Sequence, residues 1–247
     1  MTAKTKLVQL LIVLFFFGSV HAQDYKFGKV SEEEVLEKQH PTDSSASAAY
    51  LFKKRNSYYR YDKGVGLRLI TEVHNRIKIY SKDGFDYASE AINLYETSGA
   101  DERVSGLKGY TYTMDDGEMV ETKLDKESIF DTQVSKNHKQ VKFTMPNVKE
   151  GSVVEYQYKI TSPFVQSIDE FVFQHAIPVK KLVAKMRILE YFKFNQRTKG
   201  FLIIDSNTNV VTDHSLGINV TEVAFDMADI PALKEERFVT NMDNYRS

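Results

Sequence analysis

Apolar and polar residues alternate along residues 66–85 over the length of a long strand. One parity is apolar and the other is charged or polar. The apolar set is Leu67, Leu69, Val73, Ile77 and Ile79, and the polar set is Arg68, Glu72, His74, Arg76 and Lys78. Such alternation predicts a β-strand with one buried face and one solvated face. The sequence Lys82-Asp83-Gly84 predicts a turn that closes this strand.

The rest of the chain carries many strand patterns and few helix patterns. Asp116-Gly117 lies between two strand-like runs and predicts a tight hairpin over residues 109–124. Further strands are predicted at 48–52, 140–145, 170–176, 183–192, 208–212 and 218–225. Many strands with little helix predict a mainly β fold, an antiparallel β-sandwich with one short N-terminal helix.

The segment 145–163 is predicted to be a half-buried hairpin. A loop over 146–151 follows one strand, and the next strand begins near Ser152. In that strand the tyrosines share a parity with apolar residues, whereas Glu155 falls on the other parity, beside Lys159. We therefore expect Glu155 on a polar face, without the raised pKa of a catalytic acid.

The short helix is indicated by a capping box. Ser31 is followed three positions later by Glu34, and an apolar pair comes next. Pro41 requires the helix to end by His40. The predicted layout is a signal peptide at 1–22, a short helix and lead-in loop at 23–45, a β-sandwich domain at 46–230, and an extended lead-out at 231–247 toward a next domain that is missing from the chain.

The N-terminus has the pattern of a secretory signal peptide. Lys4 and Lys6 precede an apolar run over 7–17, and small residues follow, with cleavage expected between Ala22 and Gln23. The apolar run is shorter than the roughly 20 residues that a membrane-spanning helix needs. We expect an exported protein with no stable membrane span after the signal is removed.

Composition and charge exclude two classes of function. The chain has 33 basic residues, 31 without Lys4 and Lys6, against 34 acidic residues, so the exported form has a formal net charge of −3. A near-neutral chain without a basic block is not expected to bind nucleic acid. The sequence has no cysteine, and therefore no thiol nucleophile and no thiolate metal site.

The search for candidate chemistry assigns no catalytic, cofactor-binding or metal-binding residue. The histidines are scattered and lack the spacing of metal ligands. His74 is expected at the surface, and His175 is expected to be a structural histidine. Acidic residues around Asp116 are expected to form a solvated hairpin tip.

One group of aromatic residues is a candidate ligand surface. Tyr58, Tyr59 and Tyr61 are closely spaced and could form a platform for envelope glycans, although the same pattern fits an ordinary strand. An independent hydrolase that uses two carboxylates is a third hypothesis, and it would need a concave pocket in which two carboxylates converge.

Four stretches resemble one known family in the same order along the chain. They are residues 24–52, 139–163, 173–179 and 229–247. The chain is similar there to the family called domain of unknown function 3857. The resemblance implies an exported envelope protein of a Gram-negative bacterium, whose β-rich N-terminal domain usually precedes a transglutaminase-like core and a further β domain. Such a core uses a Cys-His-Asp arrangement. Because this chain has no cysteine, no catalytic residue carries over.

These observations favour a non-catalytic accessory domain of an exported transglutaminase-like protein. The chain is expected to be a truncated or fragmentary form that lacks the core, or a stand-alone copy of the accessory domain. Its expected partner is a transglutaminase-like domain or another envelope protein, in the periplasm or at the cell surface. We also expect an apolar patch near the C-terminal segment that the absent domain would cover.

Overall fold

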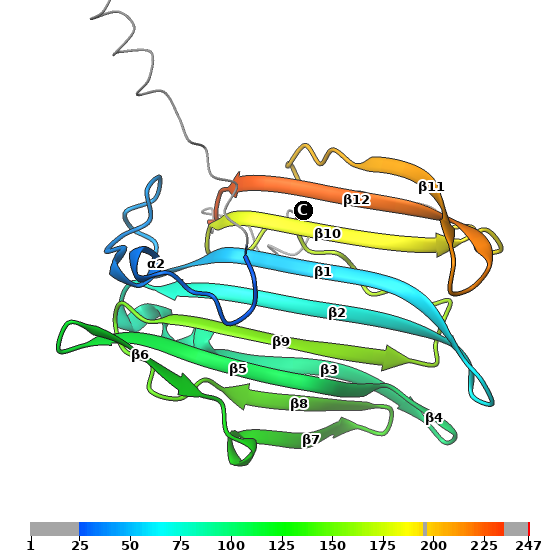
Figure 1. Cartoon of the computed structure of the whole chain (residues 1–247), viewed down its shortest axis with the longest axis horizontal. Coiled ribbons are helices and arrows are strands. Elements are labelled where there is room, and N and C mark those ends of the chain that lie inside the picture. The colour runs from blue at the N-terminus through cyan, green and yellow to red at the C-terminus, as the bar shows by residue number, and fades with distance from the viewer. Residues whose placement is uncertain (1–24, 195–196, 235–246) are drawn as a thin grey trace, which may run out of the picture.

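The computed structural model describes residues 25–194, 197–234 and Ser247, and it is mainly β (Figure 1). The larger sheet has eight strands in the order β11-β12-β10-β1-β2-β9-β5-β6. Their bounds are β1 Ala48–Asp62, β2 Gly66–Ile79, β5 Arg103–Asp115, β6 Glu118–Lys123, β9 Val153–Ser162, β10 Val179–Leu189, β11 Asn207–Asp213 and β12 Ile218–Ile230. The predicted mainly β class is confirmed.

The smaller sheet has four strands in the order β4-β3-β8-β7. They are β3 Ser89–Thr97, β4 Ala100–Asp101, β7 Ile129–Ser135 and β8 His138–Thr144. Among the described residues, the helical elements are one α-helix, α2 Glu32–Leu36, and two short 3₁₀ helices, η1 Lys82–Ala88 and η2 Lys126–Ser128. η1 replaces the turn that was predicted at Lys82-Asp83-Gly84, and it carries the chain from β2 into the smaller sheet.

One pair of strands departs from the antiparallel prediction. β1 and β10 run parallel, whereas the other recorded strand pairs are antiparallel. The parallel pair arises because the chain does not return from β9 by a hairpin. It passes through an irregular segment, residues 163–178, before β10 begins beside β1. β9 and β10 run in the same direction and are separated in the sheet by β2 and β1, so a tight hairpin cannot join them.

Local signals in the sequence predicted several elements correctly. In the capping box, the amide of Glu34 donates to the Ser31 hydroxyl at 3.3 Å, and the amide of Ser31 donates to the Glu34 carboxylate at 2.8 Å. The hairpin between β5 and β6 turns at Asp116 and Gly117, whose φ angles are 48° and 86°. The prediction of a strand at 170–176 is wrong. That stretch is irregular, and its buried Phe173 packs below β10 and β12 in an apolar cluster.

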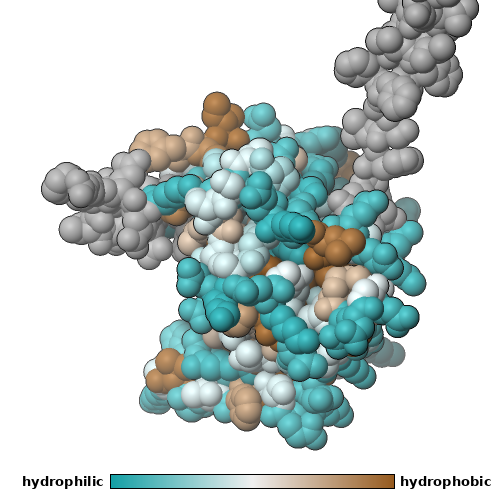
Figure 2. Space-filling model, turned by 90° about the vertical axis from the view of Figure 1, so that its left-hand side faces the viewer, coloured by the Kyte–Doolittle hydropathy of each residue, from teal (hydrophilic) through white to brown (hydrophobic). Residues whose placement is uncertain are grey.

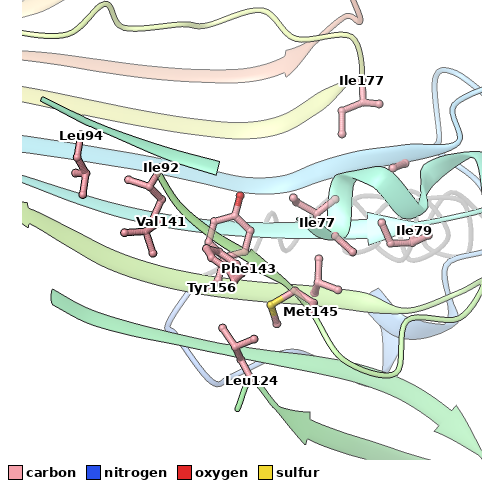
Figure 3. Packing of buried hydrophobic residues seen from close by; sticks show 13 residues of the cluster. Ile77, Ile79, Ile92, Leu94, Leu124, Val141, Phe143, Met145, Tyr156 and Ile177 are labelled. Atoms are coloured by element: carbon pink, nitrogen blue, oxygen red, sulfur yellow. The ribbon is translucent and has the colours of Figure 1, made fainter. Parts of the chain in front are cut away.

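The main core lies between the two sheets (Figure 3). Ile77 of β2 and Tyr156 of β9 meet Ile92 of β3 and Phe143 of β8 in one apolar cluster. The rings of Phe143 and Tyr156 pack edge to face, with their centroids 5.2 Å apart. Because this cluster contains residues of both sheets, burial of the same apolar side chains holds the sheets together.

The predicted hairpin at 145–163 is not a hairpin. β8 pairs with β3 and β7, whereas β9 pairs with β2 and β5, so the loop between them crosses from one sheet to the other. Asn147 and Gly151 in this loop have φ angles of 53° and 86°. The polar loop residues were correctly predicted, but the pairing of the flanking strands was not.

The polar side chains of β2 that were predicted to be solvated are buried in the C-terminal half of the strand. His74, Arg76 and Lys78 are all buried, and Glu155 of β9 is fully buried beside them. The reason is that the N-terminal segment, residues 25–37, covers this face of the larger sheet. Val30 and Val35 of that segment pack against Leu51 and Val153. A strand that is covered on both sides has no solvated face.

Two predictions concern segments outside the described residues. The signal peptide at 1–22 and its cleavage site between Ala22 and Gln23 lie there, as does most of the lead-out at 231–247. Within the part of the chain that the structure describes, no helix has the length and apolar character needed to cross a membrane.

Candidate functional site

A cleft of about 540 Å³ opens between the two sheets and the irregular segment 163–178. Strands β1, β2, β9 and β10 form its floor, and β3 forms one wall. Concave sites of roughly 300–1,000 Å³ are the usual size for small-ligand binding. The polar groups that reach this cleft therefore define the candidate functional site.

Lys53 is the principal cation on the cleft floor. A bulge in β1 between Tyr50 and Phe52 shifts the strand alternation, so that Leu51 and Phe52 both pack toward the N-terminal segment. Lys53 consequently lies on the same side as Tyr50, with its Nζ 4.6 Å from the centre of that ring. Burial lowers the pKa of Lys53 to about 8, against a smaller opposing effect of the Glu90 charge.

Glu90 is the carboxylate on the opposite wall. It extends from β3, and the Tyr156 hydroxyl donates to its Oε2 at 2.5 Å. Asn75 Nδ2 donates to the same hydroxyl at 3.0 Å, which holds the phenol in place. Burial raises the pKa of the neighbouring Tyr158 phenol, and the Glu90 charge raises it further, so this phenol stays protonated and can donate.

Arg55 forms the third side of the cleft. Its guanidinium stacks on the Phe171 ring at 4.2 Å and donates to the carbonyls of Glu170 at 2.7 Å and Asp169 at 3.2 Å. Burial lowers the pKa of Arg55, and the charge of Asp169 opposes that effect. Arg55 thus fastens the irregular segment 163–178 to β1 and helps to shape the cleft.

The chemistry available in this cleft is ionic recognition. Lys53 and Glu90 lie on two sides of the cleft, Arg55, Glu102, Asp169 and Glu170 also line it, and apolar side chains form much of the remaining wall. Among the described residues, no group of three or more histidine, aspartate or glutamate side chains is placed to hold a metal ion. A carboxylate hydrolase would need a second carboxylate converging on Glu90. Glu170 on the rim pairs with Lys199 at 2.8 Å, and Glu102 accepts from the Tyr95 amide at 2.8 Å.

A second polar cluster lies on the opposite face of the larger sheet. Glu155 Oε1 accepts from Arg76 Nη2 at 2.7 Å and lies 2.7 Å from His74 Nε2. Its Oε2 accepts from the amide of Gly28 at 2.7 Å. Arg76 Nη1 donates to both oxygens of Glu34, at 3.0 and 2.9 Å. The N-terminal segment is thereby bonded to β2 and β9.

The charges of this cluster stabilise one another. Burial alone would raise the pKa of Glu155, but the hydrogen bond to His74, the Arg76 charge and the Gly28 amide together lower it below the ordinary value. Burial alone would lower the pKa of Arg76, but Glu155 and Glu34 together raise it. This matches the expectation that Glu155 lacks a raised pKa, but for a different reason. The carboxylate is buried and paired rather than solvated.

Lys78 extends the same attachment along β2. Its Nζ donates to the carbonyls of Val35 at 2.5 Å and Gly151 at 2.6 Å, and burial lowers its pKa to about 8. Each charged group named in this cluster bonds to another part of the chain. We interpret the cluster as a structural attachment of the N-terminal segment and not as a catalytic site.

The three tyrosines of the candidate ligand surface do not form one surface. Tyr59 is 2 % exposed, and its hydroxyl donates to the carbonyl of Val165 at 2.8 Å. Tyr58 lies on the other face of β1, where its hydroxyl donates to Glu72 at 3.1 Å. Tyr61 is 62 % exposed. Strand alternation separates Tyr58 from Tyr59, so a flat platform made of all three is ruled out.

The residues of the cleft were not singled out from the sequence. Lys53 lies in a run of charged residues that reads as a solvated strand face, and the bulge that turns it inward has no glycine or proline to mark it. Glu90 lies in β3, which was not predicted as a strand. Its position opposite Lys53 depends on the packing of the two sheets, for which the local sequence holds no signal.

Comparison with solved structures places the fold among known proteins. A protein from Parabacteroides distasonis that is proposed to be a protease aligns with a TM-score of 0.55 at 14% identity, over 81% of this chain and 39% of that protein. The chain therefore spans well under half of that protein, and the likeness concerns the fold alone.

Two further structures align more weakly. They are a proposed nutrient-binding protein from Legionella pneumophila, with a TM-score of 0.35, 6% identity, and coverage of 74% of this chain and 63% of that one, and yeast LTA4 hydrolase, with a TM-score of 0.30, 10% identity, and coverage of 73% and 29%. No curated protein sequence matched.

Comparison with family profiles gives a match over residues 68–233. This range includes most of β2, the whole smaller sheet and the strands up to β12. The family is described as a domain of unknown function with a solved structure, DUF3857. The match covers well over half of the sequence, and the chain therefore belongs to the DUF3857 family.

Proposed function

We propose that this chain is a non-catalytic accessory domain that binds the catalytic core of a larger exported protein. The observation that carries the proposal is the fold shared with a proposed protease of which the chain spans only 39%. A protein of that kind contains further parts beyond this fold. The expected core is transglutaminase-like, as the family resemblance implies.

The composition of the chain fits a non-catalytic role. A cysteine-protease-type core attacks its substrate with a thiolate, and the sequence contains no cysteine. His74 lies 2.7 Å from a carboxylate, but that carboxylate is Glu155 inside the structural cluster described above. A partner would have to supply the nucleophile.

The proposal treats the two sheets as the layers of a β-sandwich, since one apolar cluster joins them. Export to the periplasm or envelope is also part of the proposal, and it depends on the signal-like N-terminus.

The surface near the chain end offers a contact region for a core. Ile203 is 85% exposed, and the amide of the neighbouring Leu202 donates to the Ser247 hydroxyl at 3.1 Å. Large contiguous apolar patches often mark interfaces, and the proposal places Ile203 within such a contact with the core. On the face seen in Figure 2, the described apolar side chains form separate patches among hydrophilic ones.

The first test is to read the coding sequence around this chain in its source genome. We expect a transglutaminase-like core with a cysteine and a histidine in the same protein or in a neighbouring gene. The core and the chain are then expressed separately, and their association is measured by isothermal titration calorimetry.

An Ile203→Asp variant of the chain is expected to weaken this association. Val120→Asp is the matched control, because Val120 is also exposed but lies in the β5–β6 hairpin, away from the chain end. The proposal fails if no such core is encoded, if core and chain do not associate, or if the purified chain alone cleaves or cross-links peptides.

A further inference from the structure

We propose that the cleft between the two sheets binds a small zwitterion with an apolar side chain, an α-amino acid or a dipeptide. Its carboxylate would pair with Lys53, and its ammonium group would pair with Glu90. The inference does not depend on the accessory role proposed above.

Lys53 and Glu90 both line the cleft, yet they form no ion pair with each other. The Nζ atom of Lys53 lies instead over the ring of Tyr50. Glu90 receives the Tyr156 hydroxyl on one oxygen, and its other oxygen accepts no hydrogen bond from a described residue. A charge removed from bulk water gains from an opposite partner. A ligand that carries both signs would give each group its partner.

The remainder of the wall is suited to an apolar side chain. Several lining residues belong to the apolar clusters on either side of the cleft. They are Ile92, Leu94, Phe171, Phe173 and Leu182. A volume of about 540 Å³ has room for an amino acid or a dipeptide within the usual range for such sites.

The charged residues that line the cleft disfavour two other ligand classes. A phosphate or a polyanion would gain the charge of Lys53 but would approach Glu90 and the rim carboxylates of Asp169 and Glu170. A simple amine would be attracted to Glu90 and repelled by Lys53. The guanidinium of Arg55 keeps its charge, but it already donates to two backbone carbonyls and stacks on the Phe171 ring, and the charge of Asp169 acts on it. It is therefore less available to a ligand than the ammonium group of Lys53.

Calorimetric titration of the purified full chain tests the proposal with four probes at pH 7. L-leucine and L-leucyl-L-leucine carry both charges, 4-methylpentanoate lacks the ammonium group, and 3-methylbutylamine lacks the carboxylate. We expect at least one zwitterion to bind with a Kd of about 10 mM or lower. The Kd of both singly charged probes should be higher by roughly tenfold or more. The two zwitterions distinguish a free amino acid from a dipeptide.

Variants assign each charge to its residue. Lys53→Met should weaken binding of the zwitterion roughly tenfold, and Glu90→Gln should do the same while its amide oxygen can still accept from Tyr156. Lys142→Met is the control, because this lysine is exposed on β8 outside the cleft. Circular dichroism and urea unfolding show whether each variant is folded, and Lys53→Arg, which keeps the charge, should retain part of the affinity.

Three results would overturn the proposal. The first is that neither zwitterion binds. The second is that the singly charged probes bind as tightly as the zwitterions. The third is that folded Lys53→Met and Glu90→Gln variants bind like the control.

Discussion

Arg76 and Glu155 are register partners on the neighbouring strands β2 and β9, and their side chains form an ion pair of 2.7 Å that is buried from solvent. Arg76 also bonds to Glu34 and to the carbonyl of Lys26 in the N-terminal segment. A single guanidinium thus joins two strands of the sheet to a segment far away in the sequence. The stability of this face should depend on it.

Replacement of Arg76 by methionine should strongly destabilise the protein. The variant leaves Glu34 and Glu155 buried without their main cation, and breaking a buried pair in this way costs about 3–5 kcal/mol. Urea unfolding at pH 7 measures the change. Arg103→Met is the control, since its pair with Asp101 is long at 3.7 Å and Arg103 is 78% exposed, so the loss should stay within about 1 kcal/mol. If both variants lost the same free energy of unfolding, the buried ion pair would contribute no more to stability than the exposed one.

The lowered pKa of Glu155 predicts a stability that depends on acid pH. A carboxyl group whose pKa is lower in the folded state contributes stability that is fully present above the pKa of the unfolded chain, and this stability is lost as pH falls through the folded pKa. Glu155→Gln should therefore be less stable than the wild type at pH 7, and the difference should shrink below about pH 4. Urea unfolding of both proteins between pH 7 and pH 3 checks this. A difference that is constant with pH contradicts the assignment.

Features that depend on neighbouring residues could be predicted from the sequence. The capping box at Ser31 and the Asp116-Gly117 turn are each fixed by bonds or angles within a few residues. β2 was placed nearly at its observed bounds because its alternation is long. Its polar face was misread because residues 25–37 cover it, and local alternation cannot reveal a cover supplied by a distant segment.

The candidate site was hidden from the sequence for two reasons. A bulge in β1 moves Lys53 to the inner face and Tyr59 into the core, whereas a regular alternation would place Lys53 with Leu51. Glu90 then meets this face only because the smaller sheet packs on the larger one. Register shifts and the docking of sheets are decided by tertiary packing.

Gly84 in η1 should not accept a side chain. A Cβ atom there would lie 2.3 Å from the carbonyl oxygen of Ser47, and that carbonyl is fixed by bonds from the amides of Tyr80 and Ser81. Gly84→Ala should cost about 1–3 kcal/mol, measured by thermal unfolding. At Gly109 the nearest atoms are the Met145 side-chain terminus, at 2.8 and 2.9 Å, which can move. Gly109→Ala should therefore cost less, and the reverse order would contradict the packing described.

Tyr59 and Tyr61 should respond differently to removal of the hydroxyl group. Tyr59→Phe loses the bond to the Val165 carbonyl and should cost about 1 kcal/mol, whereas Tyr61→Phe should leave stability unchanged, since Tyr61 is exposed. Urea unfolding measures both. Any test of glycan binding should use Tyr61, because truncation of Tyr59 would also disturb the core. A stability loss at Tyr61 similar to that at Tyr59 would contradict the burial difference.

The lowered pKa of Lys53 predicts a second pH dependence, at alkaline pH. The folded protein releases this proton near pH 8 and the unfolded chain near its ordinary value of 10.5, so between these values the unfolded state binds more protons and stability rises with pH. Lys53→Met removes this dependence. We therefore expect the variant to be more stable than the wild type at pH 7, with the advantage shrinking as pH rises from about 8 toward 10. Other groups, including Lys78, titrate in both proteins and cancel in the comparison. Urea unfolding of the two proteins from pH 6.5 to about 9.5 measures the difference, and an advantage that does not change with pH would mean that Lys53 keeps an ordinary pKa in the cleft.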